Sequence, residues 1–204
     1  MKRIVLIIMV SALYSCGGAK YNYFFDTGRQ LDFSHGKWIL NSTKSNSRIF
    51  DNELYDTSLK GFKNILGDSL VEMNDLRSTN LIAPKIKFEL SEADLNELKR
   101  NTDCDYIINI GGNVISDGLG TLSFSDQNEN SSNRASVSIS IYDLNTKTLI
   151  SSSQVYGKIE NRESVFPEDN KHLPSINPSS HMIMLKGAEK LIRKYGKNQL
   201  IYNK

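Results

Sequence analysis

The sequence has few of the residues that usually bind metal ions or carry redox chemistry, and it has no large excess of charge of one sign. Its 204 residues include two cysteines, three histidines and one tryptophan. Basic and acidic residues number 25 and 23, so the chain lacks the basic excess by which a nucleic-acid-binding surface is first recognised. Hydrophobic residues make up 39% and charged residues 24%. These values fit a single globular body and exclude a polytopic membrane protein or a fully disordered chain.

Long apolar runs are also absent, since no stretch approaches the roughly 20 residues that a membrane-spanning helix needs. The apolar run from Ile4 to Val10 directly follows Lys2 and Arg3. A basic start before a short apolar run is typical of a secretory signal peptide. We therefore expect residues 1–15 to be removed. Because Lys2 and Arg3 leave with them, the mature chain would carry 23 basic and 23 acidic residues.

The apolar run ends in Leu13-Tyr14-Ser15-Cys16-Gly17, which resembles the lipobox of bacterial lipoproteins. In that motif an aliphatic and a small residue precede the cysteine that receives the lipid, and Leu13 and Ser15 stand at these positions. The resemblance implies a diacylglyceryl thioether on Cys16 and an acyl chain, such as palmitate, on its new amino group. Several acyl chains hold a protein on a membrane where one chain binds only marginally. The alternative is a core element with a chance cysteine.

The residues directly after Cys16 indicate to which membrane, and to which face of it, a lipoprotein is sorted. Gly17 stands where the inner-membrane retention signal of lipoproteins has Asp, so the resemblance implies sorting to the outer membrane. Surface-export signals are acidic just after the cysteine, and residues 17–20 contain no acid, which favours the periplasmic face. We expect residues 16–35 to form a lipidated tether that docks in part through its aromatic side chains. Residues 36–204 are then expected to form one domain.

The second cysteine, Cys104, has no intramolecular disulfide partner if Cys16 carries lipid. An unpaired thiol in an oxidising compartment is safest when it is buried, and Cys104 stands at the start of an apolar segment. Its sequence neighbours are acidic, which raises a thiol pKa and disfavours a reactive thiolate. We therefore expect a small core residue.

The rest of the chain alternates between strand and helix patterns. Apolar periodicity predicts helices over residues 51–73, 91–98 and 181–195, with a near capping box opening the second. Apolar or alternating segments predict strands at residues 37–40, 81–88, 106–115, 137–141 and 149–159. Two early crossovers favour parallel pairs, and the final hairpin favours an antiparallel pair. The expected fold is α+β, a mixed sheet of about five strands in the order βαβαβββα, with helices packed on it.

Two passages resemble small envelope domains related to the TolB N-terminal domain and the CsgG group. In the segment from Leu95 to Ile108 a helix ends at a small residue, which is followed by Asp, an aromatic residue and a buried strand. In Ile141 to Thr146 a strand leads into the pattern Asp, x, x, Thr, and Lys147 follows where the family has Gly. The resemblance covers about residues 90–160, with the element order extending it to about 37–196. It implies an envelope assembly or activator domain and carries over no catalytic residue.

No histidine pattern indicates a metal or hydrolytic site. The three histidines lie far apart and in no metal-ligand spacing; they are His35, His172 and His181. His181 stands beside Ser179 and Ser180 at an expected helix start. There the serines are best explained as N-caps, and a serine–histidine dyad is the alternative.

Other polar patterns have structural explanations. Gly111-Gly112 and Gly118-Leu119-Gly120 lack the spacing of a phosphate-binding loop and are predicted as turn glycines at a strand end. The acidic residues between Glu89 and Glu97 surround a helix start, where they complement its dipole. Trp38 is predicted to pack in the core, and the tyrosines near residues 21–25 are predicted to dock the tether. The alternative is a carbohydrate- or partner-binding surface formed by Trp38 and these tyrosines.

The sequence therefore predicts a non-enzymatic, lipid-anchored periplasmic lipoprotein that binds a protein partner in envelope assembly or maintenance, without a cofactor or metal and without nucleic acid. The candidate contact regions are the polar segment 123–135 and the proline-containing segment 160–178. One alternative is a small-ligand or glycan-binding lipoprotein, which needs an apolar cleft. A more remote alternative is a small hydrolase that uses His181.

Overall fold

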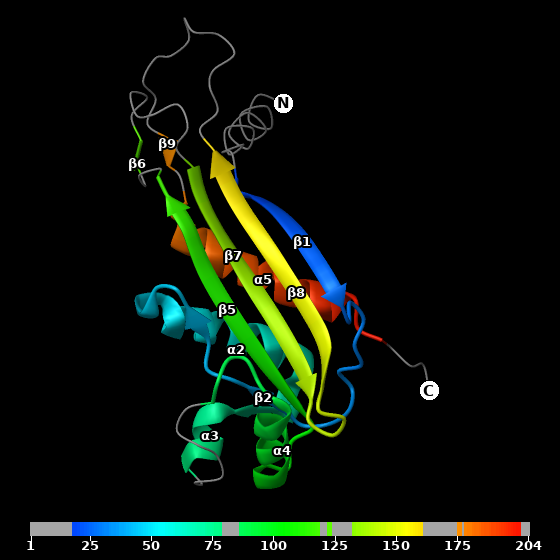
Figure 1. The fold of residues 1–204 in the computed structure, drawn as a ribbon. Coiled ribbons are helices and arrows are strands. Elements are labelled where there is room, and N and C mark those ends of the chain that lie inside the picture. Colours follow the sequence, from blue (N-terminus) through cyan, green and yellow to red (C-terminus); the bar gives the residue numbers. More distant parts are fainter. Residues whose placement is uncertain are drawn as a thin grey trace, which may run out of the picture.

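The protein folds around a mixed sheet of seven strands (Figure 1). The structure is a computed structural model that describes residues 18–78, 86–118, 122–123, 132–160, 175–176 and 178–200. The sheet order is β1-β8-β7-β5-β2-β4, and β3 pairs with β5. The strands are β1 (Lys20–Thr27), β2 (Trp38–Leu40), β3 (Lys44–Ser45), β4 (Leu70–Glu72), β5 (Tyr106–Asp117), β7 (Ser132–Asp143) and β8 (Thr148–Glu160). A separate small sheet pairs β6 (Leu122–Ser123) with β9 (Ser175–Ile176).

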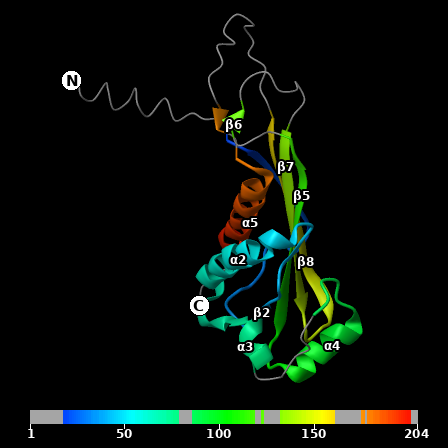
Figure 2. The ribbon, with the colours of Figure 1, turned by 90° about the vertical axis from the view of Figure 1, so that its left-hand side faces the viewer.

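Helices cover both faces of the sheet (Figure 2). The helices are α2 (Asp51–Leu66), α3 (Met73–Ser78), α4 (Glu92–Asn101) and α5 (Ser180–Lys197), with short 3₁₀ turns η1 (Arg48–Phe50) and η2 (Gly67–Ser69). α2 and α5 lie side by side on one face and bury the main core. α3 and α4 close a second, smaller core at one end of the sheet. Among the described helices, none combines the length and apolarity needed to cross a bilayer.

The predicted α+β class, the mixed sheet and the packed helices are confirmed. β2 pairs in parallel with both β4 and β5, whereas β5, β7 and β8 form antiparallel pairs. The capping box is also confirmed, because the Ser91 hydroxyl accepts the N–H of Asp94 while the Asp94 carboxylate accepts the N–H of Ser91. The sheet has seven strands where about five are expected, because β1, β3 and β4 add three strands and the strand expected at residues 81–88 is not among the seven.

The predicted tether, residues 16–35, contains the edge strand of the sheet. Residues 20–25 and Thr27 pair with β8, with a register shift between Phe25 and Thr27. Tyr21, Tyr23 and Phe25 turn towards the main core, and Leu31 and Phe33 are buried in it. The packed body therefore begins at Lys20, upstream of residue 36. Residues 1–17, which include the predicted signal peptide and Cys16, lie outside the described residues.

The first predicted helix overruns its true end. α2 stops at Leu66 because Gly67 adopts a positive φ of 56°, a backbone conformation that ends helices. Leu70 then lies in β4 and Met73 begins α3, so the apolar spacing continues across three different elements. The helix also begins after Phe50 rather than at an Asp51 or Asn52 cap.

Two other predicted elements need correction. Of the strand expected at residues 81–88, positions 81–85 lie outside the described residues, and 86–88 form no strand. Residues 132–135, expected in a polar loop, extend β7 instead. Ala135 packs in the main core and the Asn133 amide donates to the carbonyl of Pro178, so this polar stretch is held by the fold.

Gly111 and Gly112 are not turn residues, because both lie inside β5. A Cβ on Gly112 would lie 2.5 Å from Met184 Sδ and 2.9 Å from a methyl group of Leu54. A Cβ on Gly111 would lie 2.9 Å from the Phe88 ring. Glycine is used here because a strand must let helices and a covering loop approach its backbone closely.

Candidate functional site

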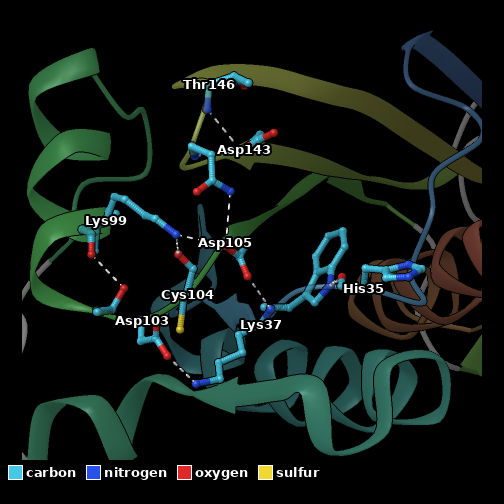
Figure 3. A network of polar contacts seen from close by, with 12 residues as sticks. His35, Lys37, Lys99, Asp103, Cys104, Asp105, Asp143 and Thr146 are labelled. Carbon is cyan, nitrogen blue, oxygen red and sulfur yellow. Dashed lines mark hydrogen bonds and ion pairs between the residues drawn. The ribbon is translucent and has the colours of Figure 1, made fainter.

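A polar network gathers where α4 leads into β5 and where the β7–β8 hairpin turns (Figure 3). Its centre is the carboxylate of Asp105, which precedes β5. One oxygen accepts the backbone N–H of Lys37 at 3.0 Å. The other accepts Lys99 Nζ at 3.0 Å and Asn145 Nδ2 at 3.2 Å. We refer to Lys37, Lys99, Asp103, Asp105 and Asn145 as the Asp105 network.

Backbone hydrogen bonds tie the same three segments together. The carbonyl of Lys37 accepts the N–H groups of Asp105 and Tyr106 at 2.8 and 3.1 Å. The carbonyl of Asp105 accepts the N–H of Leu144 at 2.8 Å. The start of β2, the start of β5 and the hairpin turn are thus joined at one point. The two passages that resemble the envelope domains meet there.

The β7–β8 hairpin turn is held by the side chain of Asp143. Asp143 Oδ1 accepts the N–H groups of Asn145 and Thr146 at 2.7 and 3.2 Å, which is the side-chain turn that aspartate favours. Lys147 follows with a φ of 60°, a left-handed conformation that glycine adopts with less strain. The left-handed position of this turn is therefore occupied by lysine.

The contacts within the Asp105 network stabilise the charged forms of Asp105, Asp103 and Lys37. The Lys37 N–H, followed by the Lys99 ammonium, lowers the pKa of Asp105. The Lys37 ammonium, 2.7 Å away, lowers the pKa of Asp103, and Asp103 in turn raises the pKa of Lys37. A general acid or base needs a pKa near the working pH. These groups are held in their charged forms, so the network is suited to joining segments rather than to proton transfer.

Acid is expected to destabilise the wild-type protein more than an Asp105→Asn variant. A carboxyl whose pKa is lower in the folded state stabilises fully at pH values above its unfolded pKa, about 3.9. That contribution is lost as pH falls through about 4 towards the folded pKa. Urea unfolding at pH 7, 5 and 3 should show a lower stability for Asp105→Asn at pH 7 and a smaller loss towards pH 3.

The control for this prediction is Asp68→Asn, because Asp68 is exposed on η2, away from the network. It should follow the wild-type curve. An Asp105→Asn curve that runs parallel to the wild type across this range would contradict the role given to the Asp105 carboxylate.

Cys104 lies in the second core with α3 and α4, as the sequence predicts. Burial raises the pKa of its thiol. A buried thiol with a raised pKa is a weak nucleophile. Cys104 is therefore a core side chain.

Trp38 is fully buried, so the predicted core packing is confirmed. Its ring stacks on Tyr106 with centroids 4.1 Å apart, and its Nε1 donates to the carbonyl of His35 at 3.1 Å. The alternative in which Trp38 lines a carbohydrate-binding surface is wrong, because no face of the ring is accessible. Tyr21 and Tyr23 lie under the ammonium groups of Lys190 and Lys194.

His181 lies in the first turn of α5, where its ring stacks on Phe50 and its Nε2 lies 2.8 Å from Glu53 Oε2. Ser179 is the N-cap, since its hydroxyl accepts the N–H of Met182, and the Ser180 hydroxyl donates to the carbonyl of Ser116. Within the described residues, no serine hydroxyl bonds to His181. The N-cap interpretation of Ser179 is confirmed, and the imidazole is placed for an ion pair between α5 and α2.

The other histidines add no site in the described part of the chain. His35 lies in an exposed loop, with Nδ1 next to the Ser34 hydroxyl and 3.3 Å from Asp32. His172 lies outside the described residues. Among those that are described, no group of three or more His, Cys, Asp or Glu side chains is arranged to hold a metal ion.

Sequence reasoning did not identify Lys37, Lys99 and Asn145 as partners of Asp105. Lys99 and Asn145 stand within the two passages that carry the family resemblance, but nothing in their spacing indicates that the passages touch. Lys37 contributes through its backbone N–H, which no sequence pattern reports. A second missed cluster is Tyr195, whose hydroxyl lies 2.7 Å from the hydroxyls of both Ser151 and Ser153 in the main core.

No family model and no curated protein sequence matches the chain. Solved structures do match. The PelC dodecamer from Paraburkholderia phytofirmans is 12% identical with a TM-score of 0.50, and the match covers 87% of this chain and 98% of that one. Lipoprotein GNA1162 from Neisseria meningitidis is 11% identical with a TM-score of 0.43, covering 64% and 87%. The LpoB C-terminal domain from Salmonella enterica is 14% identical with a TM-score of 0.37, covering 76% and 93%.

At these identities the likeness to PelC shows a shared fold. The chain is thus an α+β domain in which a mixed sheet is packed between helices, a fold that PelC also has. The resemblance to the TolB and CsgG domains stays a prediction.

Proposed function

We propose that the protein is a non-enzymatic lipoprotein, anchored by lipid on Cys16 to the outer membrane and facing the periplasm. We propose further that it acts by binding a protein partner in envelope assembly or maintenance. The observation that carries the proposal is the position of β1, which begins at Lys20 as the edge strand of the sheet. Cleavage before Cys16 therefore leaves every described strand in place. The mature chain would begin just before its first strand.

The described polar side chains support a binding role over a catalytic one. The Asp105 carboxylate accepts the Lys99 ammonium, the Asn145 amide and the backbone N–H of Lys37. His181 is paired with Glu53, and Cys104 is buried in the second core. Contacts or burial within the fold therefore explain each of these groups.

The PelC structure adds support from the fold. It is described as a dodecamer, so a domain of this architecture can present surfaces to other protein chains. We carry over to this chain the ability to form contacts with other protein chains.

In-cell crosslinking tests the proposal. The wild-type protein should capture one or two envelope proteins reproducibly by affinity recovery and mass spectrometry, and Cys16→Ser should lose them because it has no anchor. Cys104→Ser is the matched control, since it removes the other cysteine while keeping the anchor. It should capture the same proteins as the wild type. If a lipidated and folded protein recovers nothing specific, the partner-binding function fails.

A further inference from the structure

One end of the sheet holds the start of β1 together with the ends of its neighbours. Lys20 lies opposite Lys158, near the end of β8, and β7 begins opposite Glu160. α5 also begins there, because the Ser180 N–H donates to Asp117 Oδ1 at 2.9 Å. We call this the anchor end. The Asp105 network and α4 lie at the opposite end (Figures 1 and 2).

The chain between Cys16 and the sheet is short. Gly17, Gly18 and Ala19 separate Cys16 from Lys20. Four residue steps span at most about 14 Å when fully extended. β7, by contrast, runs for about 37 Å from Ser132 to Asp143 at roughly 3.4 Å per step. A lipid on Cys16 therefore holds the anchor end close to the bilayer, while the opposite end can lie well away from it.

The anchor end also exposes large apolar side chains. Ile115, near the end of β5, is 47% exposed, and Met182, in the first turn of α5, is 43% exposed. Ile49, in η1, is 82% exposed. It lies in the same region, since its neighbour Phe50 stacks on His181, next to Met182, with ring centroids 3.7 Å apart.

Basic side chains accompany these apolar ones. Lys20 is exposed at the start of β1, whereas Lys158, which lies opposite it, forms an ion pair with Glu160. Arg48 precedes Ile49 in η1. Apolar side chains that enter the interface and basic side chains that meet anionic head groups are together the chemistry of a surface that rests on a bilayer.

From the short link and this surface chemistry, and resting on the proposed lipid anchor, we infer that the anchor end contacts the bilayer directly. Ile49, Ile115 and Met182 enter the lipid interface, and the β7–β8 hairpin turn and α4 lie farthest from it. Ser132, in the predicted contact segment 123–135, and Glu160, the first residue of the predicted contact segment 160–178, lie at the anchor end. These two residues of the predicted contact segments therefore lie beside the bilayer.

Depth-dependent quenching tests this orientation. The variants are Ile115→Cys and Leu149→Cys, at sites that are 47% and 43% exposed but near opposite ends of the sheet. Each is labelled with a fluorescent maleimide on the full lipidated protein, in phosphatidylethanolamine–phosphatidylglycerol vesicles containing a doxyl-lipid quencher. The unmutated protein is carried through the same labelling as a background control, because Cys104 is buried.

The label at 115 should be quenched about threefold or more relative to the label at 149, because the sites lie about 25 Å apart along the strands. Equal quenching, or stronger quenching at 149, in protein that floats with the vesicles would overturn the orientation and leave the lipid anchor standing. Protein that does not float with the vesicles would overturn the proposed anchor itself.

Discussion

Replacing Trp38 with alanine is expected to lower the free energy of unfolding by about 3–5 kcal/mol, the range for removing a large buried aromatic side chain. The ring is fully buried and packs between Tyr106 and Phe33, with centroid distances of 4.1 and 5.0 Å. Its Nε1 hydrogen bond to the carbonyl of His35 is lost as well. Trp38 is the single tryptophan in the chain, so urea unfolding should be followed by circular dichroism.

Trp38→Phe is the control for this prediction. It keeps most of the apolar volume and removes the Nε1 donor, which leaves the His35 carbonyl without that bond; we expect a loss of about 1–2 kcal/mol. A loss below about 1 kcal/mol for Trp38→Ala would mean that the ring is not part of a packed core. The same outcome would reopen the carbohydrate-binding alternative.

Gly28→Ala is expected to destabilise the protein by about 3 kcal/mol, because a left-handed conformation and a close contact are disturbed together. Gly28 has a φ of 60°, and a Cβ at this position would lie 1.9 Å from the Ile150 carbonyl oxygen and 2.7 Å from Ser151 Cα. These are backbone atoms of β8, so they cannot move aside as a flexible side chain does. The substitution should therefore push β1 away from β8.

Gly67→Ala separates the two causes. Gly67 also has a positive φ, of 56°, but a Cβ there would meet no heavy atom within 4 Å. Its loss should be about 1 kcal/mol, from the backbone conformation alone. Equal losses for the two alanine variants, measured by urea unfolding, would contradict the close packing of Gly28 against β8.

The Gly28 prediction also bears on the membrane orientation. If β1 leaves the sheet, the first paired strand after Cys16 becomes β2, which begins at Trp38. The unpaired chain between the lipid on Cys16 and the sheet would then extend to Trp38 and would no longer hold the anchor end close to the bilayer. A lipidated Gly28→Ala protein should therefore stay on vesicles and lose the difference in quenching between positions 115 and 149.

The parts of the fold that could be predicted from sequence are those that local patterns determine. Strict alternation from Val137 to Ile141 predicts a strand with one buried face, and the Asp143 turn closes its hairpin. Ser91 and Asp94 predict the start of α4 because a capping box is complete within one turn. Each of these signals needs only near neighbours in the sequence.

The parts that could not be predicted depend on contacts between distant segments. Residues 20–27 form a strand only because β8, more than a hundred residues later, offers an edge to pair with. In the sequence, Gly112 has the pattern of a turn glycine. In the fold, glycine is needed there because the side chains of Met184 and Leu54 pack against its backbone. Short strands such as β3 and β4 carry too few residues for any periodicity to show.

The same distinction applies to the candidate site. The burial of Cys104 could be predicted because the thiol has no disulfide partner and stands at the start of an apolar strand. The link between Asp105 and Asn145 was not, because it requires that the α4–β5 passage and the hairpin turn lie at the same end of the sheet. The sheet topology determines that placement, and the residue spacing within the α4–β5 passage or within the hairpin turn does not indicate it.

The central claim is that Cys16 carries lipid, and mass spectrometry of the mature N-terminus tests it most directly. The protein would be expressed with its own N-terminal residues in a bacterium that processes lipoproteins, extracted in detergent and digested. We expect an N-terminal peptide that begins at Cys16 and carries a diacylglyceryl group and an amide-linked acyl chain. A mature chain that retains residues 1–15, or one that begins elsewhere with an unmodified Cys16, would contradict lipid anchoring through Cys16.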